Sequence, residues 1–85
     1  MNEIEWTAKA RKQFRRIDAE QRVTIREAVG ALAQWPQCGN IKALVGRDGY
    51  RLRVGRYRVL FTVNTRNIPV VIRIEEVKKR DDRTY

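Results

Sequence analysis

The stretch GYRLRVGRYRVLF, residues 49–61, has the pattern of a β-hairpin. Aromatic and aliphatic side chains alternate with arginines on both sides of Gly55-Arg56, and this dipeptide suits a type II′ turn because glycine takes the position that requires a positive φ. The two-residue turn fixes the register and places Arg53 directly opposite Arg58. Like charges at opposed positions destabilise a sheet. The hairpin therefore sets the fold and raises the question of what the opposed arginines do.

The whole chain, residues 1–85, is short enough to predict a single domain with a modest core. No apolar run approaches the roughly 20 residues that span a bilayer. The first residues, MNEIEW, carry acids where a signal peptide would carry a basic segment, so we expect a cytoplasmic protein. Because the chain has one cysteine, Cys38, and no histidine, it lacks the usual zinc ligands, and we expect no metal and no other cofactor.

The charge is strongly basic, with 19 Lys and Arg against 10 Asp and Glu and a net charge of +9. Residues 1–41 hold 7 basic and 5 acidic side chains and residues 42–85 hold 12 and 5, so the excess rises from +2 to +7. A field of one sign on part of a small domain indicates a polyanionic partner, such as nucleic acid, an acidic protein or an anionic membrane surface. A basic surface kept for solubility is the alternative.

The first half of the chain predicts one strand and two helices. A short strand is expected at residues 3–6, after which Thr7 caps a first helix. Asp18 begins a second helix as a variant of the capping box, and Pro36 ends it. Residues 36–49 are predicted to be a connecting loop. The side chains expected to face the core share helical spacing: Ala10, Phe14, Ile17, Ile25, Ala28, Val29, Leu32 and Trp35.

After the hairpin, a four-residue turn at 64–67 would pair Val63 with Ile68 and lead into a last strand over 68–77. In that register Arg73 lies opposite Arg58. The prediction is an α+β fold of order β-α-α-β-β-β, with two N-terminal helices packed on one face of a small, mostly antiparallel four-stranded sheet. Four arginines then share the uncovered face of the sheet: Arg51, Arg53, Arg58 and Arg73.

This arginine face argues against a surface kept only for solubility. Such a surface normally mixes signs, because opposite charges across strands stabilise by a few tenths to about 1 kcal/mol and like charges cost a similar amount. Guanidinium groups bind phosphate oxygens through two parallel hydrogen bonds, so a converging cluster suits a phosphate. We therefore expect a phosphate-binding face. A different register with splayed, hydrated arginines is the alternative.

The order of the elements, the loop motif Leu44-Val45-Gly46 and above all YRLRVGRYR at residues 50–58 resemble the RelE/ParE superfamily of bacterial toxins, over essentially the whole chain. The resemblance implies a compact α+β toxin that is neutralised by a cognate antitoxin wrapped around it. RelE-like members are endoribonucleases that cut mRNA in the ribosomal decoding site, whereas ParE-like members poison DNA gyrase.

The RelE branch is favoured by a residue-by-residue match. The resemblance implies a catalytic role for five positions that correspond to the functional residues of the nuclease: Arg51, Arg53, Arg58, Arg80 and Tyr85. The first two are lysines in the nuclease, and an arginine is effectively never deprotonated, so it cannot easily serve as a general base. An arginine that the nuclease carries at the position of Val45 is also missing here.

RNA supplies its own nucleophile in the 2′-OH, so the protein need only align it, stabilise the charge on the phosphate and move two protons. The arginines suit the electrostatic role. For proton transfer we favour Tyr85, with Lys78 and Lys79 as the other candidates. Substrate binding is expected from Arg73, Lys78 and Lys79.

The favoured interpretation is thus a toxin that acts as a metal-independent, ribosome-dependent endoribonuclease. Its expected partners are an antitoxin, mRNA in the decoding site and ribosomal RNA, with no membrane and no small-molecule cofactor. A gyrase inhibitor on the same fold, without nuclease activity, is the main alternative. An inactive nucleic-acid-binding relative is a third.

Overall fold

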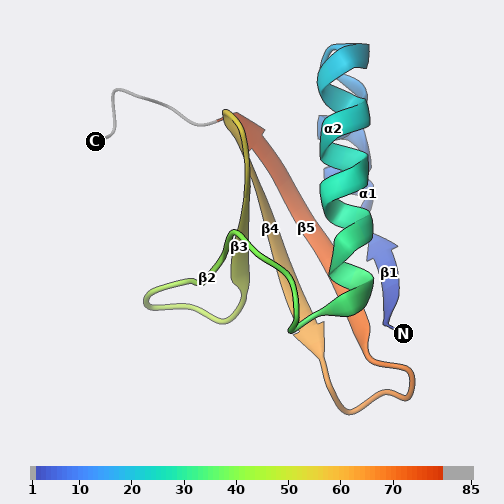
Figure 1. The fold of residues 1–85 in the computed structure, drawn as a ribbon, viewed down its shortest axis with the longest axis vertical. Coiled ribbons are helices and arrows are strands. Elements are labelled where there is room, and N and C mark those ends of the chain that lie inside the picture. Colours follow the sequence, from blue (N-terminus) through green and yellow to red (C-terminus); the bar gives the residue numbers. More distant parts are fainter. Residues whose placement is uncertain (1, 80–85) are drawn as a thin grey trace.

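The computed structural model describes residues 2–79, which form two layers, a twisted sheet with helices on one face (Figure 1). The sheet of the described residues has five strands in the order β1-β5-β4-β3-β2, in which β1 runs parallel to β5 and all other pairs are antiparallel. The elements are β1 (Glu3–Trp6), α1 (Ala8–Arg15), α2 (Ala19–Gly30), the 3₁₀ helix η1 (Ala31–Gln34), β2 (Ile41–Ala43), β3 (Tyr50–Val54), β4 (Tyr57–Asn64) and β5 (Val71–Lys79). The predicted α+β class is confirmed.

The additional strand, β2, lies inside the segment that was predicted to be a loop. It pairs with β3 through Ile41 opposite Leu52 and Lys42 opposite Arg51. A strand of three residues alternates too briefly to be distinguished from a loop by its pattern alone. The sheet consequently has five strands where four were predicted.

Both helices begin where the sequence predicts, but their caps differ. The hydroxyl of Thr7 accepts a hydrogen bond from the backbone N–H of Ala10 at 3.0 Å, as an N-cap does. Asp18 occupies the second N-cap position without a capping hydrogen bond from its side chain, so the expected capping box does not form. The helical path continues through η1, and Trp35 then leaves it with ψ 137° because Pro36 follows.

The core lies between the helices and the covered face of the sheet. Phe61 is 1% exposed and stacks on Tyr50, with 5.5 Å between the ring centroids. Trp35 packs edge-on against Tyr50 and Trp6 packs against Phe14, so the aromatic residues are packing residues as expected. Fully buried side chains come from both layers: Ala10, Ile25, Leu32, Val59, Ile72 and Ile74.

The predicted register between β4 and β5 is wrong. The chain forms a longer loop over residues 65–70, Val63 pairs with Ile72, and Ile68 is 99% exposed in the loop. The physical reason is Pro69, which lacks a backbone N–H. Since β5 has neighbours on both sides, a proline within it would leave a ladder hydrogen bond unmade.

A β-bulge in β5 further changes its register with β4. Leu60 pairs with Glu76 and the next residue, Phe61, pairs with Ile74, so Glu75 is an extra residue in the ladder. The bulge allows Ile74 and Val77 to face the core although two residues, an even number, lie between them. Within residues 2–79, no helix is both long enough and apolar enough to cross a bilayer.

Candidate nucleic-acid interface

Three cations lie side by side on the sheet face that the helices leave uncovered. Arg53 of β3 is opposite Arg58 of β4, and Arg58 is opposite Lys78 of β5. We call these three residues the cationic row. The Arg53–Arg58 pair confirms the predicted hairpin register. The prediction of Arg73 as the third member is wrong, because Lys78 takes that position. The row therefore contains two arginines and one amine.

A second line of basic residues runs beside the row. Arg51 is half-buried on β3, and Lys42 of β2 lies opposite it. Strand alternation places Arg51 on the same face as Arg53. Lys42 was not predicted to lie here because its strand is so short. The alternation Ile41-Lys42-Ala43 beside the hairpin is the one signal that could have revealed it.

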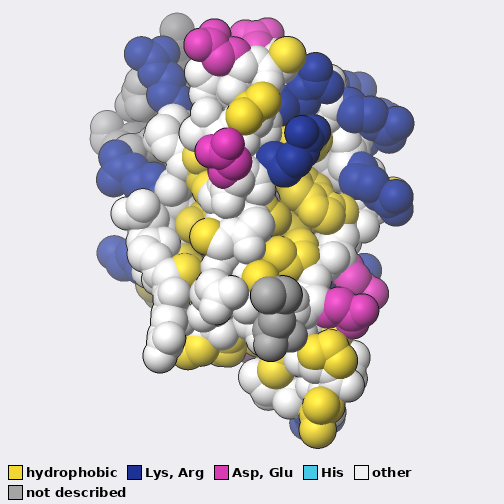
Figure 2. Space-filling view, turned by 45° about the vertical axis from the view of Figure 1, so that its right-hand side comes forward, with side chains coloured by type: hydrophobic (Ala, Val, Ile, Leu, Met, Phe, Trp, Pro, Cys, Tyr) yellow, Lys and Arg dark blue, Asp and Glu magenta, His cyan; other side chains and the backbone are white. Residues whose placement is uncertain are grey.

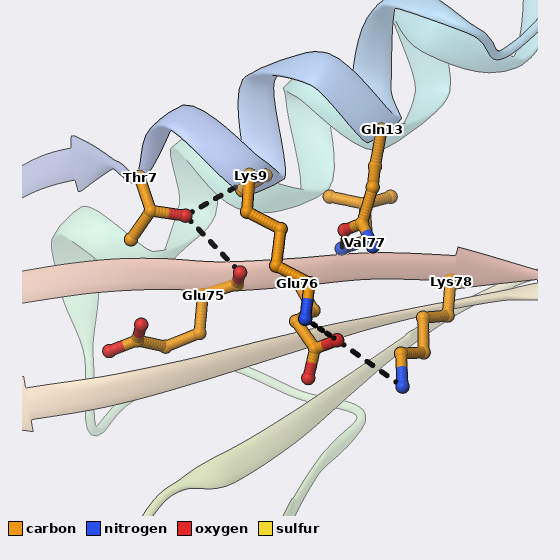
Figure 3. A network of polar contacts seen from close by, with 8 residues as sticks. Thr7, Lys9, Gln13, Glu75, Glu76, Val77 and Lys78 are labelled. Atoms are coloured by element: carbon orange, nitrogen blue, oxygen red, sulfur yellow. Dashed lines mark hydrogen bonds and ion pairs between the residues drawn. The ribbon is translucent and has the colours of Figure 1, made fainter.

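An acidic residue, Glu76, also lies on this face, and it contacts two lysines (Figure 3). One carboxylate oxygen lies 3.2 Å from the Nζ atom of Lys78 and 2.9 Å from the Nζ atom of Lys9, which reaches over from α1. The Glu76 side chain is only 12% exposed. Hydrogen bonding to Lys9 lowers the pKa of the carboxyl group, and burial opposes this effect only in part. Glu76 is therefore ionised at neutral pH.

Arg73 lies elsewhere on the face, in a group whose charges are balanced. Its Nε atom is 3.7 Å from a carboxylate oxygen of Glu75, and that same oxygen accepts a hydrogen bond from the hydroxyl of Thr62 at 3.0 Å. Arg73 also lines a shallow pocket with Trp6 and Arg11. The structure thus separates Arg73 from the row to which the sequence assigned it.

The remaining predicted site residues are placed as follows. Lys79 pairs with Tyr57 and lines a pocket with Asp18 at the junction of the two helices, away from the cationic row. Arg80 and Tyr85 lie outside the described residues. Residues 2–79 contain no group of three histidine, cysteine, aspartate or glutamate side chains that could hold a metal ion.

The N-cap residue Thr7 and Gln13 of α1 bond to the strand that carries Lys78. β1 ends at Trp6, opposite Ile74, so β5 has no strand neighbour on that side beyond this point. There the backbone N–H of Val77 donates to the amide oxygen of Gln13 at 2.7 Å, and the Thr7 hydroxyl donates to the carbonyl of Glu75 at 3.2 Å (Figure 3). These two bonds satisfy backbone groups that a strand edge would otherwise leave open.

Basic side chains are also present on the helix-bearing side. Figure 2 shows dark-blue Lys and Arg side chains on both flanks of its upper half, with apolar side chains between them. The loop between β4 and β5 projects at the lower end and carries Ile68. The basic surface therefore extends beyond the sheet, but on the sheet the cations occupy directly opposed positions on neighbouring strands.

Comparison with known proteins places the chain in a family. Residues 4–80 match the model of the ParE toxin of the type II toxin–antitoxin system parDE. No curated protein sequence matches the chain.

Solved structures share its fold. The RelBE2 toxin–antitoxin complex of Mycobacterium tuberculosis has a TM-score of 0.79 at 21% identity, covering 92% of this chain and 96% of the other. The archaeal RelE–RelB complex of Pyrococcus horikoshii has a TM-score of 0.78 at 24% identity, with 95% and 97% covered. Isolated E. coli RelE toxin has a TM-score of 0.77 at 18% identity, with 93% and 84% covered. Because the family model matches most of the sequence, the chain belongs to the ParE toxin family, within the RelE/ParE superfamily of toxins from type II toxin–antitoxin systems.

Proposed function

We propose that this toxin is a ribosome-dependent endoribonuclease that inhibits translation by cutting mRNA in the decoding site. The observation that carries the proposal is the cationic row, Arg53, Arg58 and Lys78, on the uncovered face of the sheet. Adjacent cations on neighbouring strands destabilise the sheet on their own, and a phosphate diester lying across them would offset that cost. A toxin that inhibits gyrase by protein contact has no need of such a phosphate site.

The reaction would begin with attack of the ribose 2′-OH on the adjacent phosphorus. The P–O5′ bond then breaks, leaving a 2′,3′-cyclic phosphate and a 5′-OH. Arg53 and Arg58 would stabilise the additional negative charge on the phosphate oxygens in the transition state. Arg51 and Lys42 would hold neighbouring phosphates of the mRNA. An mRNA with a single 2′-deoxy nucleotide before the cut should therefore resist cleavage at that site.

Proton transfer has three candidates, Lys78, Lys79 and Tyr85. Lys78 lies directly opposite Arg58, and its amine can give up a proton, whereas a guanidinium stays protonated. Tyr85, with Arg80, is suggested by the family resemblance and lies outside the described residues. We propose that Lys78, on the sheet, transfers one of the two protons that the reaction moves. Tyr85 is the group that the resemblance suggests for the second proton. Lys79 is the weaker candidate because it lies away from the row.

The alternative is inhibition of DNA gyrase, and the match to a ParE family model is the observation that favours it. One pair of assays separates the two functions. Purified toxin is incubated with ribosomes programmed with a defined mRNA, and separately with gyrase and relaxed plasmid. We expect mRNA cleavage by the wild-type protein and none by Arg58→Ala, with normal supercoiling in both. Gyrase inhibition without cleavage would overturn the proposal.

We further propose that a cognate antitoxin is the neutralising partner, as the complexes of similar toxins with their antitoxins suggest. The basic face would attract an acidic segment of the antitoxin, and complementary charge mainly raises the association rate. The rate constant for association should fall by about tenfold or more between 50 and 500 mM salt, while the dissociation rate changes less. Stopped-flow fluorescence would measure both. A salt-independent association rate would show that this face does not steer the partner.

A further inference from the structure

Glu76 places a carboxylate on the face that we propose to bind RNA phosphates, where an acidic side chain is unexpected. The β5 bulge turns both Glu75 and Glu76 toward the uncovered face, where Glu76 lies beside a member of the cationic row. A negative charge here weakens the attraction of a polyanion. Its presence therefore needs a reason other than nonspecific binding.

The charged neighbours of Glu76 are two lysines. From α1, the Nζ atom of Lys9 lies 2.9 Å away, and from β5 itself the Nζ atom of Lys78 lies 3.2 Å away. The residue opposite on β4 is Leu60, which is buried and carries no charge. Both charged neighbours are thus cations, and the carboxylate, 12% exposed, is more enclosed than an ordinary surface ion pair.

Lys78 is the member of the row that most needs such a contact. A lysine amine sits at the end of a flexible four-carbon chain, whereas the planar guanidinium groups of Arg53 and Arg58 lose less freedom when they bind. Repulsion from Arg58 favours conformations in which the amine turns away. The contact with Glu76 opposes this repulsion.

We propose that Glu76 is a positioning residue, which fixes the Lys78 amine beside Arg58 so that the row meets the reacting phosphate with its three cations at set places. This inference rests on the proposed nuclease function. Glu76 would act through Lys78, without contact with the substrate.

The test compares Glu76→Gln with Glu75→Gln. Both variants remove one negative charge from neighbouring residues on the same face, but Glu75 contacts Arg73 and Thr62 and has no contact with Lys78 among the described interactions. Single-turnover cleavage on programmed ribosomes should fall about tenfold or more in Glu76→Gln, since a displacement of about 1 Å can cost up to a hundredfold. RNA binding should be as tight as in the wild type or tighter, because a negative charge has been lost. Glu75→Gln should keep the wild-type rate.

Two further variants separate positioning from a purely structural role. In a Lys78→Met background, Glu76→Gln should cause no additional loss of rate, because its effect passes through Lys78. Lys9→Met removes the link to α1 and leaves the contact between Glu76 and Lys78 in place. It should lower the melting temperature and leave the rate unchanged. A loss of rate in Lys9→Met equal to that in Glu76→Gln would assign Glu76 to the fold alone and overturn the inference.

If Glu76→Gln does not fold, Glu76→Asp takes its place. This change keeps the charge and withdraws the carboxylate by one methylene, about 1.5 Å, and it should slow cleavage in the same way. A wild-type rate in the folded Glu76 variant would sink the inference while leaving the nuclease function intact. Absence of cleavage by the wild-type protein would sink both the inference and the proposed function.

Discussion

Two groups of charged side chains on the same sheet face differ in how far acids balance their cations. Arg73 lies beside Glu75, whose carboxylate also accepts the Thr62 hydroxyl, so the guanidinium is offset within the protein. In the cationic row, three cations lie at opposed positions on neighbouring strands, and the acid beside them, Glu76, is shared by Lys78 and Lys9. A balanced group needs no ligand. Opposed cations are costly in the free protein and are stabilised when an anion binds, so the row is the part of the face that points to function.

Removing the centre of the row should have the largest effect. Arg58→Ala deletes the only side chain with cationic neighbours on both adjacent strands of the row as the structure describes it. We expect a loss of about 10²- to 10³-fold in single-turnover cleavage, the magnitude typical of losing one group that stabilises transition-state charge. Circular dichroism should show a folded protein with a melting temperature within a few degrees of the wild type. Retained cleavage with a large loss of stability would make Arg58 a structural residue.

Removing one cation from each of the two groups tests whether they differ in function. Lys78→Met should reduce the cleavage rate by about 10²-fold if its amine exchanges a proton, whereas Arg73→Ala should change the rate by less than about threefold. The two variants lose the same charge, so nonspecific binding to RNA should weaken equally in both. Equal losses of cleavage would mean that total charge matters and the row does not.

The hairpin was predictable because its information is local. Two residues of turn fix the pairing of β3 with β4, and the alternation then decides which side chains reach the core, so Arg53 opposite Arg58 follows from the sequence. The same argument fails for β5. Its register depends on a six-residue loop, on the exclusion of Pro69 from a strand with two neighbours and on a bulge at Glu75, and none of these has a short sequence signal.

The error at β5 altered the candidate site in a particular way. The wrong register put Arg73 in the row in place of Lys78. It also left Glu76 out of the site, because the partner of Glu76, Lys9, comes from a helix whose position relative to the sheet cannot be read from sequence spacing. Lys42 was missed for another reason, the brevity of its strand. A row of cations was therefore predictable, whereas the identity of its third member, Lys78, and the acid beside it required the three-dimensional register.

A smaller effect is expected where α1 holds β5. The Thr7 hydroxyl accepts from the N–H of Ala10 and donates to the carbonyl of Glu75, so Thr7→Val removes both bonds while keeping the shape of the side chain. We expect a loss of about 1–2 kcal/mol in the free energy of unfolding, measured by urea denaturation. Cleavage at 25 °C should be nearly unchanged, because the row itself is intact. Thr65→Val, in the exposed loop, is the matched control and should leave stability as it was.

The smallest effect should come from protonating the acid next to the row. The pKa of Glu76 is lowered in the folded protein, chiefly by the hydrogen bond from Lys9, so the carboxylate stabilises the fold above the ordinary glutamate pKa of about 4.3. That contribution is lost as the pH falls through the lower, folded-state pKa. Between pH 6 and pH 3 the wild type should therefore lose more stability than Glu76→Gln, by less than about 1 kcal/mol. Thermal melts of both proteins across this range would measure the difference. If the two curves stay parallel down to pH 3, the lysine contacts of Glu76 add nothing to stability, and the balance of charge beside the row is weaker than its distances indicate.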